Sequence, residues 1–370
     1  MNLSVDFFHL LASIFISFIG GSLLLAIWYH IQKQFKTKLI EDEQQPRLDK
    51  GLFYLALAMF VWVVSGVWNL IYINFSSLDA QNFTAGLSIF SALNNICFFF
   101  ALFYFRHAPK YLFQKSKIRT TISFTILGLA FITIISTFIF GDDFYIFNSL
   151  KLNAIPDFLI SILITYWLML TFYKTFTQRN LKLIGIIAFL ALLMMLVSQL
   201  PDVIKLPESI FTFHLIKIIA KTSLISICLV LATSWVIELA QTPTSKEVTL
   251  HFIDWSLVKI TIPSKDIYDE LIDFGSKTTQ FKNFLLFAIS RQNQNASKQG
   301  ILVGSDGKIK SQTYLSRIIE NINSILNLEK NNALERKDLF TFLGEGTYRL
   351  RVLPEHIKID EALKNEFQKK

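Results

Sequence analysis

Charged residues are scarce in this sequence. Lysine, arginine, aspartate and glutamate together make up only 17% of it, whereas 52% is hydrophobic. In soluble domains the charged share is about a quarter. A fold that placed this much apolar surface in water would aggregate. The composition therefore excludes an ordinary water-soluble protein.

Cysteines and catalytic motifs are also scarce. The only cysteines are Cys97 and Cys228, and both lie in apolar stretches, which excludes a disulfide framework. We interpret them as buried, reduced thiols. The signatures of zinc proteases, serine hydrolases and P-loop proteins are absent. We therefore predict no catalytic residue, no metal and no cofactor, and we interpret the chain as not an enzyme.

Long apolar stretches fill the first two thirds of the chain. A membrane-spanning helix needs about 20 mainly apolar residues. Seven stretches meet this length, namely 7–28, 51–73, 86–105, 120–140, 156–176, 181–200 and 209–238. The sequence thus predicts a polytopic α-helical membrane protein with seven transmembrane helices in a lipid bilayer.

The lysines and arginines of the predicted loops lie almost entirely on one side of the bundle. Loops 29–50, 106–119 and 174–182 hold thirteen of them, whereas the alternate loops hold only Lys151 and Lys205. Because positively charged loops stay in the cytoplasm, the N-terminus is predicted outside and the C-terminus inside. The membrane is then the plasma membrane, which is the inner membrane in a bacterium.

Composition changes near residue 241. We predict a transmembrane domain over 1–240, a linker over 241–247 and a small cytoplasmic α+β domain over 248–370. In the last part, residues 257–262 alternate as in a strand, and 313–328 repeat apolar residues at helical spacing. The predicted fold class is thus a seven-helix membrane domain followed by an α+β domain.

Near the C-terminus, two strand-prone runs flank Gly344-Glu345-Gly346, which predicts a hairpin. The run FTFLGEGTYRL at 340–350 resembles the wing of OmpR-type winged-helix effector domains. The run YLSRII at 314–319 sits where that family has its recognition helix. The family's usual arginine before the first glycine is missing here. The resemblance implies a winged-helix domain that contacts DNA or a protein.

The same resemblance indicates which residues would make that contact. Arginine and lysine suit guanine edges and phosphates, and asparagine and glutamine suit adenine. From the residues of these types on the predicted helix, which also include Asn323, on the loop before it and on the wing, we select Lys308, Lys310, Gln312, Arg317, Asn321, Arg349 and Arg351.

Ionisable side chains inside apolar spans are costly and mark candidate functional sites. His214, Lys217 and Lys221 follow one another on one face of the last span. A structural alternative is that Lys217 extends to the interface while Lys221 makes a hydrogen bond within the protein. The predicted polar stripe that binds a small ligand comprises His214, Lys217, Lys221, Asp157, Asn94, Asn95 and Gln199.

Together these patterns favour a signalling receptor or sensor. Its partners would be the lipid bilayer, a small ligand, a cytoplasmic protein or DNA, and a second copy of the chain. One alternative is a transporter or channel with a regulatory tail, which predicts interrupted spans. The other is an intramembrane enzyme that uses Ser88, His214 or Lys221, which requires these side chains to lie within hydrogen-bond reach.

Overall fold

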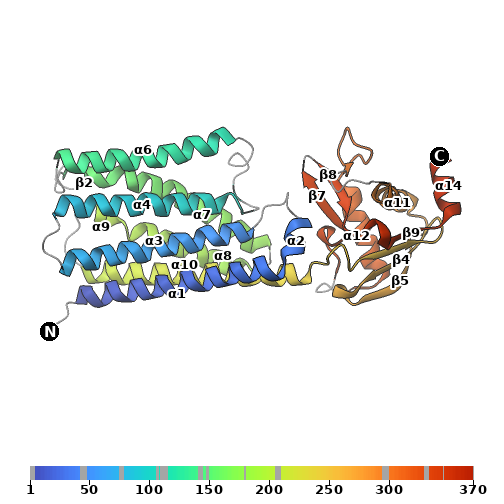
Figure 1. Cartoon of the computed structure of the whole chain (residues 1–370), viewed down its shortest axis with the longest axis horizontal. Coiled ribbons are helices and arrows are strands. Elements are labelled where there is room, and N and C mark those ends of the chain that lie inside the picture. Colours follow the sequence, from blue (N-terminus) through green and yellow to red (C-terminus); the bar gives the residue numbers. More distant parts are fainter. Residues whose placement is uncertain are drawn as a thin grey trace. The chain divides into compact units, whose positions relative to one another are not determined.

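The chain divides into two compact units. The first contains residues 1–33 and 46–235, and the second contains 34–45 and 236–370. The computed structural model (Figure 1) describes residues 5–41, 48–74, 79–105, 108, 116–140, 145–146, 150–178, 181–204, 210–293, 300–328, 333–344 and 346–369.

The first unit is a helical bundle (Figure 1). Its long helices are α1 (Val5–Gln34), α3 (Leu48–Asn74), α4 (Ala80–Leu102), α6 (Ser116–Phe140), α7 (Ile155–Gln178) and α10 (Ile210–Gln241). Two shorter helices, α8 (Lys182–Val197) and α9 (Leu200–Val203), lie between the last two, and strands β1 (Tyr145–Ile146) and β2 (Leu150–Lys151) pair antiparallel. The last turns of α10 belong to the second unit.

Among the described residues, six helices are long and apolar enough to cross a membrane. The segments are Phe7–Gln34, Asp49–Asn74, Ala80–Leu102, Thr120–Ile139, Ile155–Thr177 and Leu215–Gln241. Six of the predicted spans are thus confirmed as helices of spanning length, and the chain is an integral membrane protein. The lipid bilayer is its environment.

The predicted span at 181–200 is not confirmed. Helix α8 has 16 residues, so it is about 24 Å long, whereas the hydrocarbon core is about 30 Å thick. The helix ends at Val197, and Pro201 lies at the start of the separate helix α9. The predicted span ran through this interruption because only Ser198 and Gln199 separate the apolar residues of α8 from Leu200.

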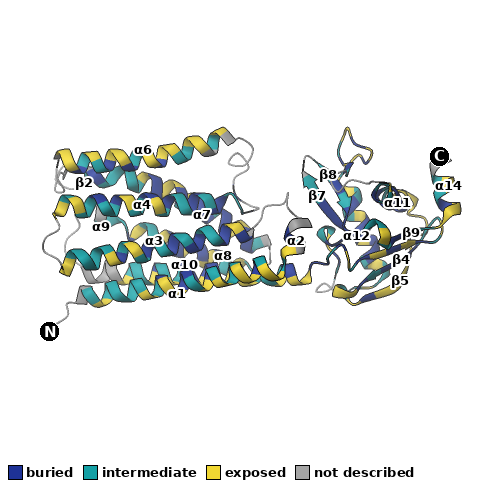
Figure 2. Cartoon of the chain, viewed as in Figure 1, coloured by how far each residue is buried: buried dark blue, intermediate teal, exposed yellow. Residues whose placement is uncertain are grey.

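Exposed residues recur along the helices of the bundle (Figure 2), and many of them are large and apolar. Phe124, Phe131 and Ile139 of α6 are each more than 60% exposed, and Leu183 of α8 is 70% exposed. In water such a surface would be unstable, whereas lipid tails solvate it. Helix α4 packs against α3, α6 and α7, and α7 packs against α8.

A glycine allows one of these close approaches. A Cβ atom on Gly86 of α4 would lie only 2.6 Å from the indole nitrogen of Trp68 in α3. That indole N–H donates to the carbonyl oxygen of Phe83 at 3.2 Å. Small residues let membrane helices approach closely, which is the main source of their packing energy.

The second unit is built on two sheets. The first sheet contains β3 (Thr249–Phe252), β4 (Leu257–Ile262), β5 (Ile267–Asp273) and β9 (Ile357–Ile359), in the order β5-β4-β3-β9. Only the β3–β9 pair is parallel. The second sheet has the order β6-β8-β7, with β6 (Ile301–Leu302), β7 (Phe340–Gly344) and β8 (Thr347–Leu350), all antiparallel.

Helices cover these sheets and enclose one core (Figure 1). They are α11 (Thr278–Gln292), α12 (Thr313–Ile325), the four-residue α13 (Arg336–Leu339) and α14 (Glu361–Lys369). The predicted apolar stripe of α12 is buried at Leu315, Ile318 and Ile322. Phe252 and Phe284 are fully buried, with ring centroids 5.2 Å apart. The predicted α+β character of this part is thus confirmed.

Two features of this unit concern the predicted linker and the predicted recognition helix. In the segment 241–247, Thr242 and Ser245 are buried, and Leu353 donates its backbone N–H to the Ser245 carbonyl oxygen. The run at 314–319 lies on α12, whereas the helix directly before the hairpin is the short α13. The apolar stripe of α12 is buried in the core of this unit.

Candidate functional site

A cavity of about 600 Å³ lies within the first unit. Its walls come from the second half of α3, the first parts of α4, α7 and α10, the end of α8, parts of α6 and α9, and β2 with the segment after it. Sites for small molecules have volumes of about 300–1,000 Å³. The cavity is therefore large enough for a small ligand.

One side of the cavity is basic. Lys217 and Lys221 lie one helical turn apart on α10, so they share a face, and Lys151 of β2 also lines the cavity. The Lys221 Nζ atom donates to the Ser13 Oγ atom of α1 at 3.0 Å and lies 5.2 Å from the ring centroid of Trp62 on α3. Two other helices thus fix the Lys221 ammonium group.

Another part of the cavity wall carries acceptors. Asp157 lies in the first turn of α7, where the helix dipole favours a carboxylate. The Asp157 carboxylate accepts a hydrogen bond from the Ser91 side chain of α4. Among the described residues, the buried Oδ1 atoms of Asp157 and Asn94 have no hydrogen-bond partner. These two acceptors can receive protons from a bound molecule.

The backbone is interrupted where α8 reaches the cavity. Ser198 is the C-cap of α8, and its hydroxyl donates to the Met195 carbonyl oxygen at 2.7 Å. Ser198, Gln199 and Pro201 all line the cavity. Non-helical backbone at membrane depth is tolerated where it is buried in protein or lines a cavity.

Most of the predicted polar stripe lines this cavity. Lys217, Lys221, Asp157, Asn94 and Gln199 do so. Two predicted residues do not join them in the described structure. Asn95 is buried on α4 but is not part of the cavity wall, and the His214 side chain lies outside the described residues.

Sequence reasoning missed several residues of the site. It did not identify Ser13 as the partner of Lys221, because serines in apolar helices are common and usually bond to their own backbone. It also did not select Trp62 or Asn153, which line the cavity. Lys151 was counted only as a loop charge. No local signal distinguishes these residues, since they meet only after the helices pack.

The predicted intramembrane catalytic arrangement is not found among the described side chains. The Ser88 hydroxyl donates to the Thr84 carbonyl oxygen of its own helix at 3.2 Å. Lys221 bonds to Ser13 rather than to Ser88. Among the described side chains, no hydrogen bond joins Ser88 to Lys221.

The predicted DNA- or partner-binding residues lie in different environments. Lys308, Lys310, Gln312 and Arg317 are exposed, and Arg349 is half-buried. Two members of the set are not on the surface. Asn321 lies on the core side of α12 and accepts a hydrogen bond from Lys277 Nζ at 2.6 Å, and Arg351 is only 1% exposed. In this structure these two side chains are therefore not exposed to a partner.

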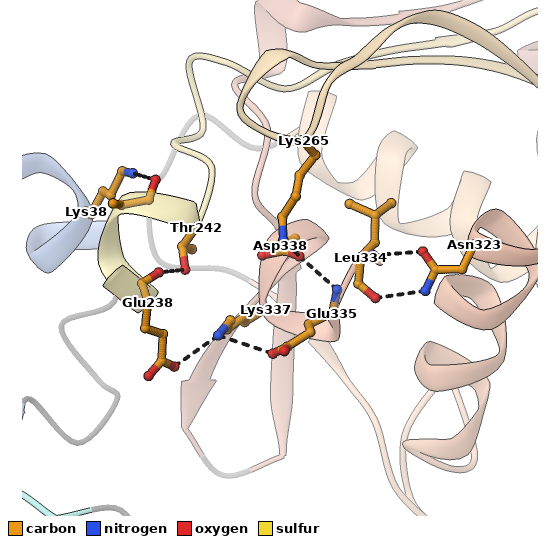
Figure 3. Close-up of polar contacts among 10 residues, drawn as sticks. Lys38, Glu238, Thr242, Lys265, Asn323, Leu334, Glu335, Lys337 and Asp338 are labelled. Atoms are coloured by element: carbon orange, nitrogen blue, oxygen red, sulfur yellow. Dashed lines mark hydrogen bonds and ion pairs between the residues drawn. The ribbon is translucent and has the colours of Figure 1, made fainter. Parts of the chain in front are cut away.

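A polar cluster holds the end of α10 within the second unit (Figure 3). The Lys337 ammonium group bonds to the Glu238 carboxylate of α10 at 3.0 Å and to the Glu335 carboxylate at 3.2 Å. Lys38 of α2 (Lys36–Glu41) donates to the carbonyl oxygen of Leu239 at 2.8 Å. A lysine at this position satisfies a free carbonyl group and complements the negative end of the helix dipole.

The charge on Lys337 is favoured by its surroundings. Burial by itself lowers the pKa of Lys337, but the charges of Glu238 and Glu335, and the hydrogen bonds to them, outweigh it and raise the pKa above its usual value. The neighbouring Asp338 is fully buried, 3.4 Å from Lys265 Nζ. Burial raises the pKa of Asp338, although a backbone hydrogen bond at Glu335 and two lysine charges oppose the effect.

Asp338 and Glu335 also hold α13 in place. The Asp338 side chain accepts the Glu335 backbone N–H at 2.8 Å, and the two residues form a reciprocal capping box (Figure 3). Lys337 is therefore presented to Glu238 from a short helix with a fixed start.

Comparison of the chain with family models, with curated proteins and with solved structures finds no match in any of the three.

Proposed function

We propose that the protein is a membrane receptor that binds a small polar ligand in the cavity and relays its state through α10. The supporting observation is that one helix takes part in both units. Helix α10 carries Lys217 and Lys221 at the cavity and Glu238 at the contact with Lys337. A ligand that shifts the first part of α10 therefore acts on a helix whose end is bound in the second unit.

The proposed receptor crosses the membrane seven times, with its N-terminus outside and its C-terminus in the cytoplasm. The seventh crossing would be made by α8 together with α9. With the basic loops on the cytoplasmic side, the N-terminus lies outside, and an odd number of crossings then places the C-terminal part in the cytoplasm. The cavity would then lie toward the outer side, where the sparsely charged loops are.

The second unit is proposed to be winged-helix-like and to bind a protein. Its order α11, β6, α12, α13 and the β7–β8 hairpin supports the first part of this proposal. A basic face would favour DNA, since phosphate neutralisation dominates that affinity. On the exposed side of α12, however, Arg317 is followed by Glu320, so a protein partner is the better fit.

The coupling can be tested without knowing the ligand. Lys221→Met removes a cation from the cavity, and Lys174→Met removes an exposed lysine from the same unit as a matched control. Hydrogen exchange of the full-length protein in nanodiscs would follow residues 236–242 and 335–338. Allosteric coupling energies of about 1–3 kcal/mol correspond to changes of about five-fold or more. We expect such a change for Lys221→Met alone.

If both variants exchange like the wild type while Lys221→Met retains its fold, the receptor proposal is wrong. A second variant provides an independent test in case Lys221→Met does not fold. Asn94→Leu removes a different polar group from the cavity wall, and we expect it to alter exchange in the same two segments.

A transporter is the second candidate. The observation that favours it is the break between α8 and α9 at the cavity, because transporters bind their substrates between interrupted helices. Uptake of labelled solutes into proteoliposomes would distinguish it, since a receptor moves none.

A further inference from the structure

The cavity wall offers two chemically opposite sets of groups. The ammonium groups of Lys151, Lys217 and Lys221 are cationic donors, whereas the Asp157 carboxylate and the Asn94 carbonyl group are acceptors. We propose that the ligand is a small zwitterion of the amino-acid class, with a carboxylate and a protonated amine in one molecule. This inference rests on the proposed function of the cavity as a ligand site.

Lys221 is suited to bind the carboxylate. Its ammonium group has three N–H donors, and Ser13 accepts one of them at 3.0 Å. The Trp62 ring lies beneath the charge at 5.2 Å and stabilises it without using a hydrogen bond. Lys217 lies one turn earlier on the same face of α10. Two lysines one turn apart can bind the two oxygens of one carboxylate.

Asp157 and Asn94 are suited to bind the amine. Their Oδ1 atoms are buried and lack hydrogen-bond partners among the described residues. A buried acceptor without a partner is unfavourable, because it has lost its hydrogen bonds to water. Both atoms accept only, so they need a donor. A protonated amine supplies three donors and also neutralises the carboxylate charge.

Neither a simple anion nor a simple cation satisfies the whole wall. A plain anion leaves the acceptors of Asp157 and Asn94 without donors. A plain amine brings a positive charge into a cavity whose described lining carries three lysines and one aspartate. One molecule with both groups satisfies both parts of the wall.

The remaining wall combines neutral polar side chains with aromatic rings. Trp62, Phe83, Phe90 and Phe158 line the cavity. An aromatic or branched aliphatic side chain can bury its surface against these rings, at about 25 cal/mol for each Å² removed from water. Phenylalanine and leucine are therefore the first probes.

The test measures binding of matched molecules to the full-length protein in nanodiscs by thermal shift and calorimetry. Phenylalanine is compared with hydrocinnamate, which lacks the amine, and with phenethylamine, which lacks the carboxylate. Leucine is compared with isocaproate and isoamylamine in the same way. We expect an amino acid to bind at least about tenfold more tightly than either of its matched analogues, which corresponds to about 1.4 kcal/mol.

Two variants test the assignment of the two groups. Asp157→Asn should weaken binding of the amino acid about tenfold or more and leave hydrocinnamate unchanged. Lys221→Met should weaken binding of the amino acid and of hydrocinnamate alike. Lys174→Met, outside the cavity, should leave all three affinities unchanged.

The inference is overturned if neither amino acid binds, if hydrocinnamate or isocaproate binds as tightly as its parent, or if Asp157→Asn has no effect. Its failure differs from failure of the receptor proposal. If an amino acid binds but hydrogen exchange in the second unit does not change, the ligand class is supported and the receptor proposal fails. If Lys221→Met alters hydrogen exchange in the second unit but no amino acid binds, the receptor proposal is supported and the ligand class is wrong.

Discussion

Glu238→Gln should loosen the end of α10 within the second unit. The side chains of Glu238 and Lys337 are only 25% and 28% exposed and lie 3.0 Å apart. Exposed ion pairs contribute about 0.2–1 kcal/mol, and removing one partner of a fully buried pair costs about 3–5 kcal/mol. Lys337 keeps its second carboxylate, Glu335, at 3.2 Å. We therefore expect a cost of about 1–2 kcal/mol, between these limits.

Native-state hydrogen exchange measures this cost directly. The Thr242 backbone N–H donates to the Glu238 carbonyl oxygen at 3.1 Å, so its exchange reports opening of the last turn. A cost of about 1–2 kcal/mol raises the exchange rate about five- to thirty-fold. Lys259→Met removes the more exposed pair with Asp269, at 3.4 Å, and serves as the control. Lys259→Met should change the exchange rate of the Thr242 backbone N–H by less than about five-fold.

A double-mutant cycle tests the contact itself. Lys337→Met should also speed exchange of the last turn, and adding it to Glu238→Gln should cost much less than the sum of the two single changes. The reasoning fails if Glu238→Gln behaves like Lys259→Met. It also fails if the effects of Glu238→Gln and Lys337→Met simply add.

Other expectations follow from single groups. The pKa of Lys337 is raised in the folded state, so the stability that its charge contributes is full below the ordinary pKa of 10.5 and is lost as pH rises through the higher folded pKa. Thermal unfolding measured below and above the folded pKa should show this loss of stability in the wild type and not in Lys337→Met. Gly86→Ala should cost about 1–3 kcal/mol because its Cβ meets an indole, whereas Gly128→Ala, with no atom within 4 Å, should cost nothing measurable in the same denaturation assay. Asn323→Ala should cost about 1–3 kcal/mol in chemical unfolding, because it removes both hydrogen bonds to the backbone of Leu334; a cost below a few tenths would contradict this.

The sequence predicted the parts of the fold that depend on local patterns. Six apolar runs became helices of spanning length, and the alternating run at 257–262 became β4 with the same bounds. Hydropathy and strand alternation are properties of neighbouring residues. The end of α8 was missed because two polar residues, Ser198 and Gln199, are too few to lower the hydropathy averaged over a span.

The candidate site could be predicted only in part, for a physical reason. Lys221 and Asp157 could be selected because charges inside apolar runs are costly. The Ser13 partner of Lys221 could not be predicted. It lies 208 residues away in the sequence, and the two side chains come together only when α1 packs near α10. In the second unit, Asn321 and Arg351 have polar side chains that suit a surface, yet long-range packing encloses them.

The contact between Lys38 and the end of α10 sets an order for events during synthesis. Lys38 and its acceptor on Leu239 are 201 residues apart, and ribosomes add about 5–20 residues each second. The lysine therefore emerges roughly 10–40 s before the carbonyl group that it caps. During this interval α2 has no final partner, and the second unit cannot be completed from its C-terminal residues alone. A fragment that begins after α10 would lack both Lys38 and Glu238, so the natural boundary of this unit includes a segment from near the start of the chain.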